Sequence, residues 1–320
     1  HETRIYAAIK FFIFTQASSL LMLLSILGLY FIHAQNTGLY TFDYNALIHT
    51  NLAAGAGLWL SLGFLIAFLV KLPAVPFHTW LPDAHTEAPT AGSVVLAGLV
   101  LKLGAYGLLR FVVPLFPGAS HALAPWMMGL GGVGIIYGAM QAFGQTDFKR
   151  LVAYTSVSHM GFVLVGIFAW NQYALQGALM VMLAHGISTG ALFVLAGDLQ
   201  DRLHTREMAQ MGGLWETIPR YGGVSLLFAL ASLGLPGLAN FVGEFLVLLG
   251  TYQANISLAV LATLGFIGST VYSLWLIQRA FQGPNKNHWH LPKMNAREAL
   301  IFATLIAAIL WLGLFPQTIL

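Results

Sequence analysis

Long apolar stretches separated by short polar turns make up most of the sequence. A helix needs about 20 apolar residues to cross a bilayer. Nine stretches are long enough, at about residues 9–32, 53–84, 88–113, 122–143, 149–169, 173–197, 221–250, 256–281 and 297–315. None alternates between polar and apolar residues as the strands of a membrane barrel do. The pattern therefore predicts an all-α fold, a polytopic transmembrane helical bundle of about nine spans.

The composition also indicates a membrane protein. Of the 320 residues, 58% are hydrophobic and only 8% are charged, whereas a soluble domain carries about 25% charged residues. The small net charge of +3 gives no reason to expect a nucleic-acid partner. The absence of cysteine excludes disulfides, iron–sulfur ligation and thiol chemistry within this sequence. Because it starts at His1 without a methionine, we expect a processed or partial polypeptide.

The charged residues between the stretches predict the orientation in the membrane. With nine crossings, one side collects ten lysines and arginines and the other side has only Arg110. The ten are Arg4, Lys149, Arg150, Arg202, Arg206, Arg220, Arg279, Lys286, Lys293 and Arg297. Cytoplasmic loops carry the excess of such residues, so we expect a cytoplasmic N-terminus and a periplasmic C-terminus. The polar segment 198–220 is expected to lie along the cytoplasmic surface.

Proline and glycine interrupt two of the nine stretches. One contains Lys71-Leu-Pro-Ala-Val-Pro76, and the other contains Gly234-Leu-Pro-Gly shortly before Glu244. Carbonyl groups freed by a proline are tolerated at membrane depth only where protein or water satisfies them. The two breaks are five crossings apart and therefore run in opposite directions, as in transporters with inverted repeats. The alternative is a pair of kinked helices with a purely structural role.

Ionisable residues lie at membrane depth near both breaks. A charge at the centre of a transmembrane helix costs about 2.5–3.5 kcal/mol on insertion scales. Burial disfavours the charged form, and histidine titrates near neutral pH, so buried lysine, glutamate and histidine side chains are suited to exchanging protons. We therefore predict a proton relay. Its expected members are Lys71, Lys102, Glu244, His159, His185 and His78.

Other residues have simpler interpretations. Lys10 and Arg110 lie near the ends of their stretches and are expected to extend to the interface. An interfacial position is the alternative interpretation for His78 and His85. His288-Trp-His290 is a weak metal-binding pattern. The run Gly131-Gly-Val-Gly has no preceding strand and predicts no dinucleotide site, and the P-loop, HExxH and GxSxG motifs are absent.

Several motifs resemble the antiporter-like, proton-pumping subunits of respiratory complex I. They are Lys71-Leu-Pro followed by Pro76-Phe-His-Thr-Trp-Leu-Pro-Asp-Ala-His85, Glu87-Ala-Pro-Thr-Ala-Gly-Ser93, Asp147-Phe-Lys-Arg-Leu-Val-Ala-Tyr-Thr-Ser-Val-Ser-His-Met-Gly-Phe162, and Leu235-Pro-Gly with Phe241-Val-Gly-Glu-Phe245. The resemblance covers nearly the whole sequence. A glutamate stands at position 244, where chain L of the same family carries a lysine. The sequence therefore resembles another member of the family more than it resembles chain L.

The resemblance implies fourteen spans built around two inverted five-helix repeats, of which these nine are the sixth to the fourteenth. Residues 1–115 then hold the last part of the first repeat, 116–283 the second repeat, and 284–320 the C-terminal span. The family pairs its first lysine with a glutamate on a helix upstream of this sequence. The fragment alone is therefore not expected to pump.

The resemblance also implies a role for each predicted relay residue. Lys71 corresponds to the pumping lysine of the first repeat, Lys102 to the connecting lysine and Glu244 to the exit-side residue of the second repeat. His159 and His185 fall on the hydrated axis between them.

The resemblance implies a proton-translocating subunit of NADH:quinone oxidoreductase in the bacterial inner membrane. It is part of an enzyme but carries no redox chemistry itself. NADH, FMN, iron–sulfur clusters and quinone are expected in partner subunits, and the antiporter-like chains L and N and membrane lipids are the expected partners. The alternatives are a subunit of a multisubunit Na+/H+ antiporter or membrane-bound hydrogenase, a cytochrome with haem on His159 and His185, and a passive scaffold.

Overall fold

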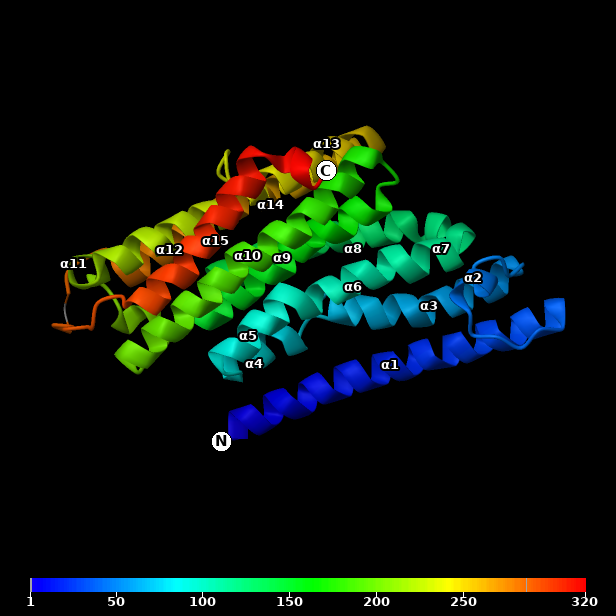
Figure 1. The fold of residues 1–320 in the computed structure, drawn as a ribbon, viewed down its shortest axis with the longest axis horizontal. Helices are drawn as coiled ribbons and strands as arrows, with labels where there is room; N and C mark the ends of the chain where they lie inside the picture. Colours follow the sequence, from blue (N-terminus) through cyan, green and yellow to red (C-terminus); the bar gives the residue numbers. More distant parts are fainter. Residues whose placement is uncertain (1, 286) are drawn as a thin grey trace.

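The computed structural model describes residues 2–285 and 287–320, which form helices joined by short loops (Figure 1). Eight helical segments in these residues are long and apolar enough to cross a membrane. They are α1 (Glu2–Thr37), α3 (Ala54–Lys71), the segment Thr90–Leu115, α8 (Pro117–Phe143), α9 (Phe148–Phe168), α10 (Gln172–Leu203), α14 (Ile256–Phe281) and α15 (Ala296–Leu314). The predicted polytopic helical bundle is confirmed. Residues 1 and 286, and with them the predictions for His1 and Lys286, lie outside the described part.

The ninth predicted stretch, 221–250, is divided into two helices that are each too short to cross alone. These are α12 (Pro219–Ser232) and α13 (Ala239–Ala254). The remaining short helices are α2 (Tyr44–Leu47), α4 (Trp80–Glu87), α11 (Leu214–Thr217) and the 3-10 turns η3 (Met208–Gln210) and η4 (Pro316–Thr318). Because α10 continues to Leu203, the first part of segment 198–220 is helical rather than a surface loop.

The helices form a bundle with α9 and α10 in its middle (Figure 1). Helix α1 lies at one edge, and α12 and α15 lie at the other. Almost every residue of α9 is buried, whereas α1 and α15 leave most of their apolar side chains exposed. The interior of the bundle is therefore built around α9, which carries His159.

Small residues allow α8 and α9 to approach closely. A Cβ atom added to Gly161 would lie 2.7 Å from the carbonyl oxygen of Gly131, and one added to Gly138 would lie 2.5 Å from the backbone nitrogen of Ser158. Close backbone approach through small residues is the usual basis of helix packing in membranes. The Gly131-Gly-Val-Gly run thus serves helix packing in this fold.

Helices α10 and α13 cross in the same way. A Cβ atom added to Gly177 would lie 2.5 Å from the backbone nitrogen of Val247, and one added to Gly243 would lie 2.6 Å from that of Val181. The close crossing brings the helix that carries Glu244 against the helix that carries His185.

The first predicted break lies between α3 and α4. Lys71 is the last residue of α3, and the Val75–Pro76 peptide bond that follows is cis. The carbonyl groups at the end of α3 would lose their helical partners here. The indole Nε1–H of Trp80 donates to the carbonyl oxygen of Val70 at 3.0 Å, and the Ala74 amide donates to that of Leu69 at 3.0 Å. Protein groups thus satisfy this open helix end.

The second predicted break lies between α12 and α13. Gly234 and Gly237 have φ angles of 79° and 95°, which glycine adopts without steric cost. A Cβ atom added to Gly234 would lie 2.6 Å from the ring of Phe266 and 3.3 Å from Oε2 of Glu244. The glycine at this break therefore leaves room for the carboxylate of the next helix.

The helix that carries Lys102 contains two π-helical turns, which the sequence did not indicate. It runs through α5 (Thr90–Val95), η1 (Leu96–Val100), α6 (Leu101–Gly107), η2 (Leu108–Val112) and α7 (Val113–Leu115). Single π turns inside helices are frequent at functional sites. Here Lys102 lies directly between the two.

Candidate functional site

A lysine and a histidine from neighbouring helices form the first contact of the site. The Nζ atom of Lys102 on α6 lies 2.6 Å from Nδ1 of His185 on α10. The same ammonium group donates to the carbonyl oxygen of Ala97 in the adjacent π turn. Lys102 is thus held between a backbone acceptor and an imidazole nitrogen that is able to take its proton.

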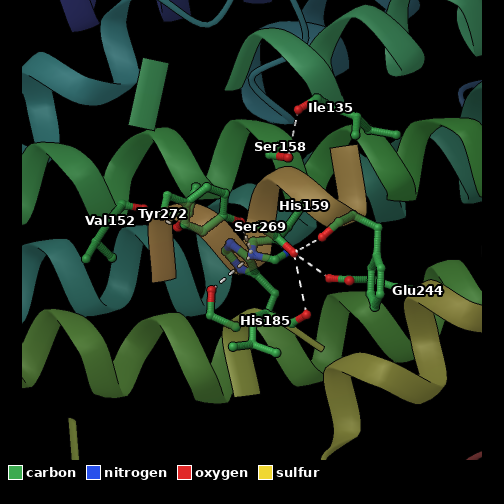
Figure 2. Close-up of polar contacts among 12 residues, drawn as sticks. Ile135, Val152, Ser158, His159, His185, Glu244, Ser269 and Tyr272 are labelled. Atoms are coloured by element: carbon green, nitrogen blue, oxygen red, sulfur yellow. Dashed lines mark hydrogen bonds and ion pairs between the residues drawn. The ribbon is translucent and has the colours of Figure 1, made fainter. Parts of the chain in front are cut away.

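A histidine and a glutamate form the second contact. The Nδ1 atom of His159 on α9 lies 2.8 Å from Oε1 of Glu244 on α13 (Figure 2). The hydroxyl groups of Ser232 and Tyr272 lie 3.3 and 3.2 Å from the other ring nitrogen, Nε2. With Glu244 ionised, the neutral ring donates through Nδ1 and accepts at Nε2.

The two contacts meet where the imidazole rings of His159 and His185 face each other. Their centroids are 5.5 Å apart and their planes are inclined by 66°. Lys102, His185, His159 and Glu244, one from each of four helices, therefore form one continuous row, which we call the buried relay. Figure 2 shows its histidine and glutamate members side by side.

The histidine and glutamate side chains of the relay are almost completely removed from solvent. His185 and Glu244 are 0% exposed, and His159 is 1% exposed. Oε2 of Glu244 and Nε2 of His185 have no hydrogen-bond partner among the described residues. Buried polar groups are normally paired with protein or ordered water. The relay is therefore polar and enclosed, and two of its atoms remain available for a proton or a water molecule.

Lys71 and His78 lie outside the row of contacts. Lys71 is half-buried, and within the described residues its side chain makes no hydrogen bond or ion pair. Its backbone packs against the Lys102 helix, since a Cβ added to Gly104 would lie 3.0 Å from the Lys71 carbonyl carbon. His78 is buried with its ring edge-on to Tyr137, at a centroid distance of 5.0 Å.

Tyr272 and Ser232 belong to the site but were not predicted. Tyr272 is completely buried on α14, and Ser232 is the last residue of α12, directly before the second break. Ser232 could have been found from its position two residues before Gly234, at the second break. Tyr272 could have been found only because it carries a hydroxyl group within an apolar stretch.

Three residues outside the relay have partners that the sequence did not indicate. Lys10 forms an ion pair with Asp83 at 2.8 Å, because α4 turns this carboxylate toward α1. His85 is not interfacial: it is completely buried and stacks on Phe193, with ring centroids 4.4 Å apart. Arg110 lies over the ring of Tyr44, at 4.6 Å from its centroid.

Ion pairs gather at one end of the bundle, where α4, α9 and α10 end or begin. Arg206 lies 3.1 Å from Asp147 and 3.6 Å from Glu87. Arg150 lies 3.4 Å from Asp83. Lys149 is 2% exposed and donates to the carbonyl oxygen of Ala88 at 3.0 Å. Several of the basic residues predicted to share one side of the membrane thus lie together at this end.

The geometry does not favour a metal or haem site. In the described part of the chain, no group of three or more His, Cys, Asp or Glu residues could hold a metal ion. In the His288-Trp-His290 pattern, Nδ1 of His290 contacts the carbonyl oxygen of His288. Both ring nitrogens of His159 already have protein partners, so this histidine has none left for iron.

Comparison with known proteins identifies the family. A family described as NADH:quinone oxidoreductase/Mrp antiporter, transmembrane, matches residues 1–270. The chain belongs to this antiporter family. Curated relatives agree: NADH-quinone oxidoreductase subunit M of Pseudomonas aeruginosa is 54% identical over 319 residues, and subunit M of Escherichia coli K12 is 53% identical over 322. Both alignments cover 100% of this chain and 63% of the relative, so the chain spans less than two thirds of their length.

Chains of three solved membrane complexes share the fold. A chain of respiratory complex I from Thermus thermophilus with bound NADH is 36% identical, with a TM-score of 0.90 over 98% of this chain and 66% of that one. A chain of the Mrp complex from Dietzia superposes with a TM-score of 0.81 at 20% identity, covering 98% of this chain and 66% of that chain. A chain of an archaeal membrane-bound sulfane sulfur reductase superposes with a TM-score of 0.87 at 24% identity. The superposition covers 96% of this chain and 52% of that chain. The last two show similarity of fold alone.

Proposed function

We propose that this chain is the part of a bacterial complex I subunit M that moves protons through the membrane. The observation that carries the proposal is the buried relay, in which Lys102, His185, His159 and Glu244 follow one another within contact distance. The similarity to subunits M of two bacteria supports the same assignment. A passive scaffold would have no use for three ionisable groups that are 0–1% exposed, since isolated buried charges are costly.

The contacts of the relay support the following path for a proton. The Lys102 ammonium group releases a proton to Nδ1 of His185, which becomes an imidazolium ion. Its Nε2 proton then passes through an intervening water molecule to Nε2 of His159, since no hydrogen bond joins the two rings in the described residues. The His159 ring then delivers a proton through Nδ1 to Oε1 of Glu244. Because Oε2 of Glu244 lies beside Gly234 at the second break, this break is the proposed exit. Lys71, at the first break, is the proposed entry residue, and His78 is proposed to act near it.

The energy must come from outside the chain. Moving one charge against 100 mV requires about 2.3 kcal/mol. We assign the redox steps, with NADH, FMN, iron–sulfur clusters and quinone, to partner subunits, and chains L and N to direct contact with this one. The chain is placed in the bacterial inner membrane, with the ion-pair end and the N-terminus on the cytoplasmic side. Residues 1–115 and 116–283 are assigned to the two inverted repeats, and 284–320 to the C-terminal span.

The experiment is NADH-driven acidification of inverted membrane vesicles that contain the whole complex. Lys102→Met keeps the length of the side chain but removes its proton, and we expect proton translocation to fall at least tenfold while the complex still assembles. Lys293→Met, which removes an exposed lysine, is the matched control and should pump normally. Normal pumping by Lys102→Met would refute the proposed relay.

The runner-up is a subunit of a multisubunit Na+/H+ antiporter or membrane-bound hydrogenase. The Mrp superposition favours it by fold, but at 20% identity, against 53–54% for the subunits M. The chains that co-purify with the full-length protein separate the two. NADH-oxidising and quinone-reducing subunits support complex I, whereas a set of small antiporter chains supports the runner-up.

A further inference from the structure

Asn240 is a buried amide that the relay does not include. It lies in the first turn of α13, four residues before Glu244, and is completely buried. Neither its amide nitrogen nor its amide oxygen has a hydrogen-bond partner among the described residues. Burying an amide without partners is costly, because the group loses the hydrogen bonds that it makes to water. Packing alone therefore does not explain a polar side chain at this position.

The register of the close α10–α13 crossing fixes what lies opposite Asn240. Gly177 of α10 meets Val247 of α13, and Val181, one turn later on α10, meets Gly243. The two helices are therefore antiparallel, and four residues forward along α10 match four residues back along α13.

Continued by one turn, this register brings Asn240 beside His185. Asn240 lies three residues before Gly243, and Ala184 lies three residues after Val181. Asn240 is therefore at the level of Ala184, the residue directly before His185. Because residues three apart share a face of a helix, Asn240 lies on the same side of α13 as Gly243, the side that packs against α10.

Four buried side chains with unpaired polar atoms meet at this level of the crossing. They are Asn240, Ser188, His185 and Glu244, and all four are completely buried. Ser188 lies three residues after His185, and Glu244 lies four residues after Asn240, so each pair shares a helix face. The Asn240 amide, the Ser188 hydroxyl, Nε2 of His185 and Oε2 of Glu244 have no partner among the described residues. A buried water molecule typically makes about three hydrogen bonds to such groups.

We propose that Asn240 is a positioning residue, which holds the water molecule that joins the imidazoles of His185 and His159. The inference rests on the proposed function. The amide oxygen of Asn240 accepts a hydrogen bond from this water molecule, and the Ser188 hydroxyl makes a second hydrogen bond to it. The imidazolium form of His185 gives its Nε2 proton to the water, and the water gives a proton to Nε2 of neutral His159. The water molecule is regenerated, and Asn240 itself exchanges no proton.

The test uses full-length protein in the assembled complex, in inverted membrane vesicles. Asn240→Leu fills the position but has no side-chain atom that can form a hydrogen bond. We expect NADH-driven proton translocation to fall at least fivefold, and the solvent deuterium isotope effect on turnover to rise, because transfer between the imidazoles becomes rate-limiting. Asn240→Ser keeps a hydroxyl group and leaves room for water, so it should translocate protons better than Asn240→Leu. A packing role alone would leave the isotope effect unchanged.

Thr251→Val is the matched control on the same helix. Thr251 is also completely buried on α13, but its hydroxyl group donates to the carbonyl oxygen of Val247 in its own helix at 2.6 Å. The substitution removes a buried polar atom that does not face the relay. We expect this variant to translocate protons normally and to keep the isotope effect of the unmodified protein.

Each outcome decides the proposal. Normal translocation and an unchanged isotope effect in Asn240→Leu overturn it, and so do equal losses in Asn240→Leu and Asn240→Ser. If Asn240→Leu does not assemble, Asn240→Val is measured in the same way and decides by the same two readouts. If Lys102→Met stops translocation while the Asn240 variants behave normally, only the role of Asn240 is wrong. If Lys102→Met itself pumps normally, the proposed function is wrong as well.

Discussion

The Nδ1 atom of His159 lies 2.8 Å from Oε1 of Glu244, and neither side chain is exposed to solvent. This contact joins α9, the central helix of the bundle, to α13, the helix that follows the second break. It gives the carboxylate of Glu244, in the second turn of α13, a direct connection to the interior row of imidazoles. The second break and the buried relay are thereby parts of one arrangement rather than separate features.

Replacing Glu244 by glutamine tests this connection. Glutamine keeps the volume and one acceptor oxygen but cannot take a proton. We expect proton translocation by the complex to fall at least tenfold. Glu216→Gln, on the exposed side of α11, is the matched control. Full translocation in Glu244→Gln would remove the carboxylate from the pathway.

Replacing Lys71 by alanine tests whether the first break takes part. Lys71 ends α3 at this break, and we expect its loss to abolish proton translocation in the intact complex although no contact joins its side chain to the relay in the described residues. Proton stoichiometry per NADH is the measurement, with Lys293→Ala as the control. An unchanged stoichiometry would show that Lys71 has no part in proton movement.

Tyr272→Phe should have a smaller effect. It removes the hydroxyl group that lies 3.2 Å from Nε2 of His159. A neutral hydrogen bond contributes about 0.5–1.5 kcal/mol, so we expect translocation to fall about two- to tenfold. Tyr252→Phe, at an exposed position, is the control. A loss as complete as that of Glu244→Gln would mean that the hydroxyl itself carries the proton.

The α8–α9 crossing predicts a stability effect with an internal control. A side chain on Gly161 would collide with the Gly131 carbonyl, whereas one on Gly129 meets nothing within 4 Å. Overpacking costs about 1–3 kcal/mol, so Gly161→Leu should lower the thermal unfolding temperature of the purified protein in detergent. Gly129→Leu should leave it unchanged. Equal unfolding temperatures for the two variants would contradict the observed crossing.

Asp147 gives the ion-pair end a defined pH dependence. Burial raises the pKa of its carboxyl group, and the Arg150 amide and the Arg206 guanidinium oppose this shift only in part. A raised pKa means that folding favours the protonated acid, so the stability contribution of Asp147 is present at low pH and is lost as the pH rises through the folded-state pKa. Asp147→Asn keeps the helix cap that Arg150 uses.

We therefore expect the unfolding temperature of Asp147→Asn, relative to that of the unmodified protein, to rise as the pH increases from below the ordinary carboxyl pKa to neutral. Thermal unfolding across this pH range is the measurement. Asp201→Asn, which removes an exposed carboxylate near the same end, is the control. If the unfolding temperature of Asp147→Asn, relative to that of the unmodified protein, falls with increasing pH, the pKa of Asp147 is lowered by folding and not raised.

The sequence predicted the two breaks because proline and glycine interrupt long apolar stretches there. It also selected Lys102, His159, His185 and Glu244, since ionisable residues stand out against so apolar a background. Their order of contact could not be predicted, because it depends on how four helices are rotated against each other. That these residues move protons stays a prediction.

Other features gave no usable sequence signal. The π turns on either side of Lys102 depend on tertiary packing, and no residue type marks them. His85 was misplaced at the interface because apolarity along the chain does not show whether a histidine faces the membrane boundary or a ring on another helix. The partner of Lys10 also left no signal, because Asp83 is distant in sequence and meets it only after folding.

The Trp80 side chain also affects how many water molecules the first break can hold. Its indole N–H occupies the Val70 carbonyl, an oxygen that an interrupted helix would otherwise offer to solvent. The indole of Trp80 therefore occupies a hydrogen-bond acceptor in the last turn of α3, next to Lys71. The hydration of this opening, and with it the ease with which an ion could enter there, depends on whether that single indole stays in place.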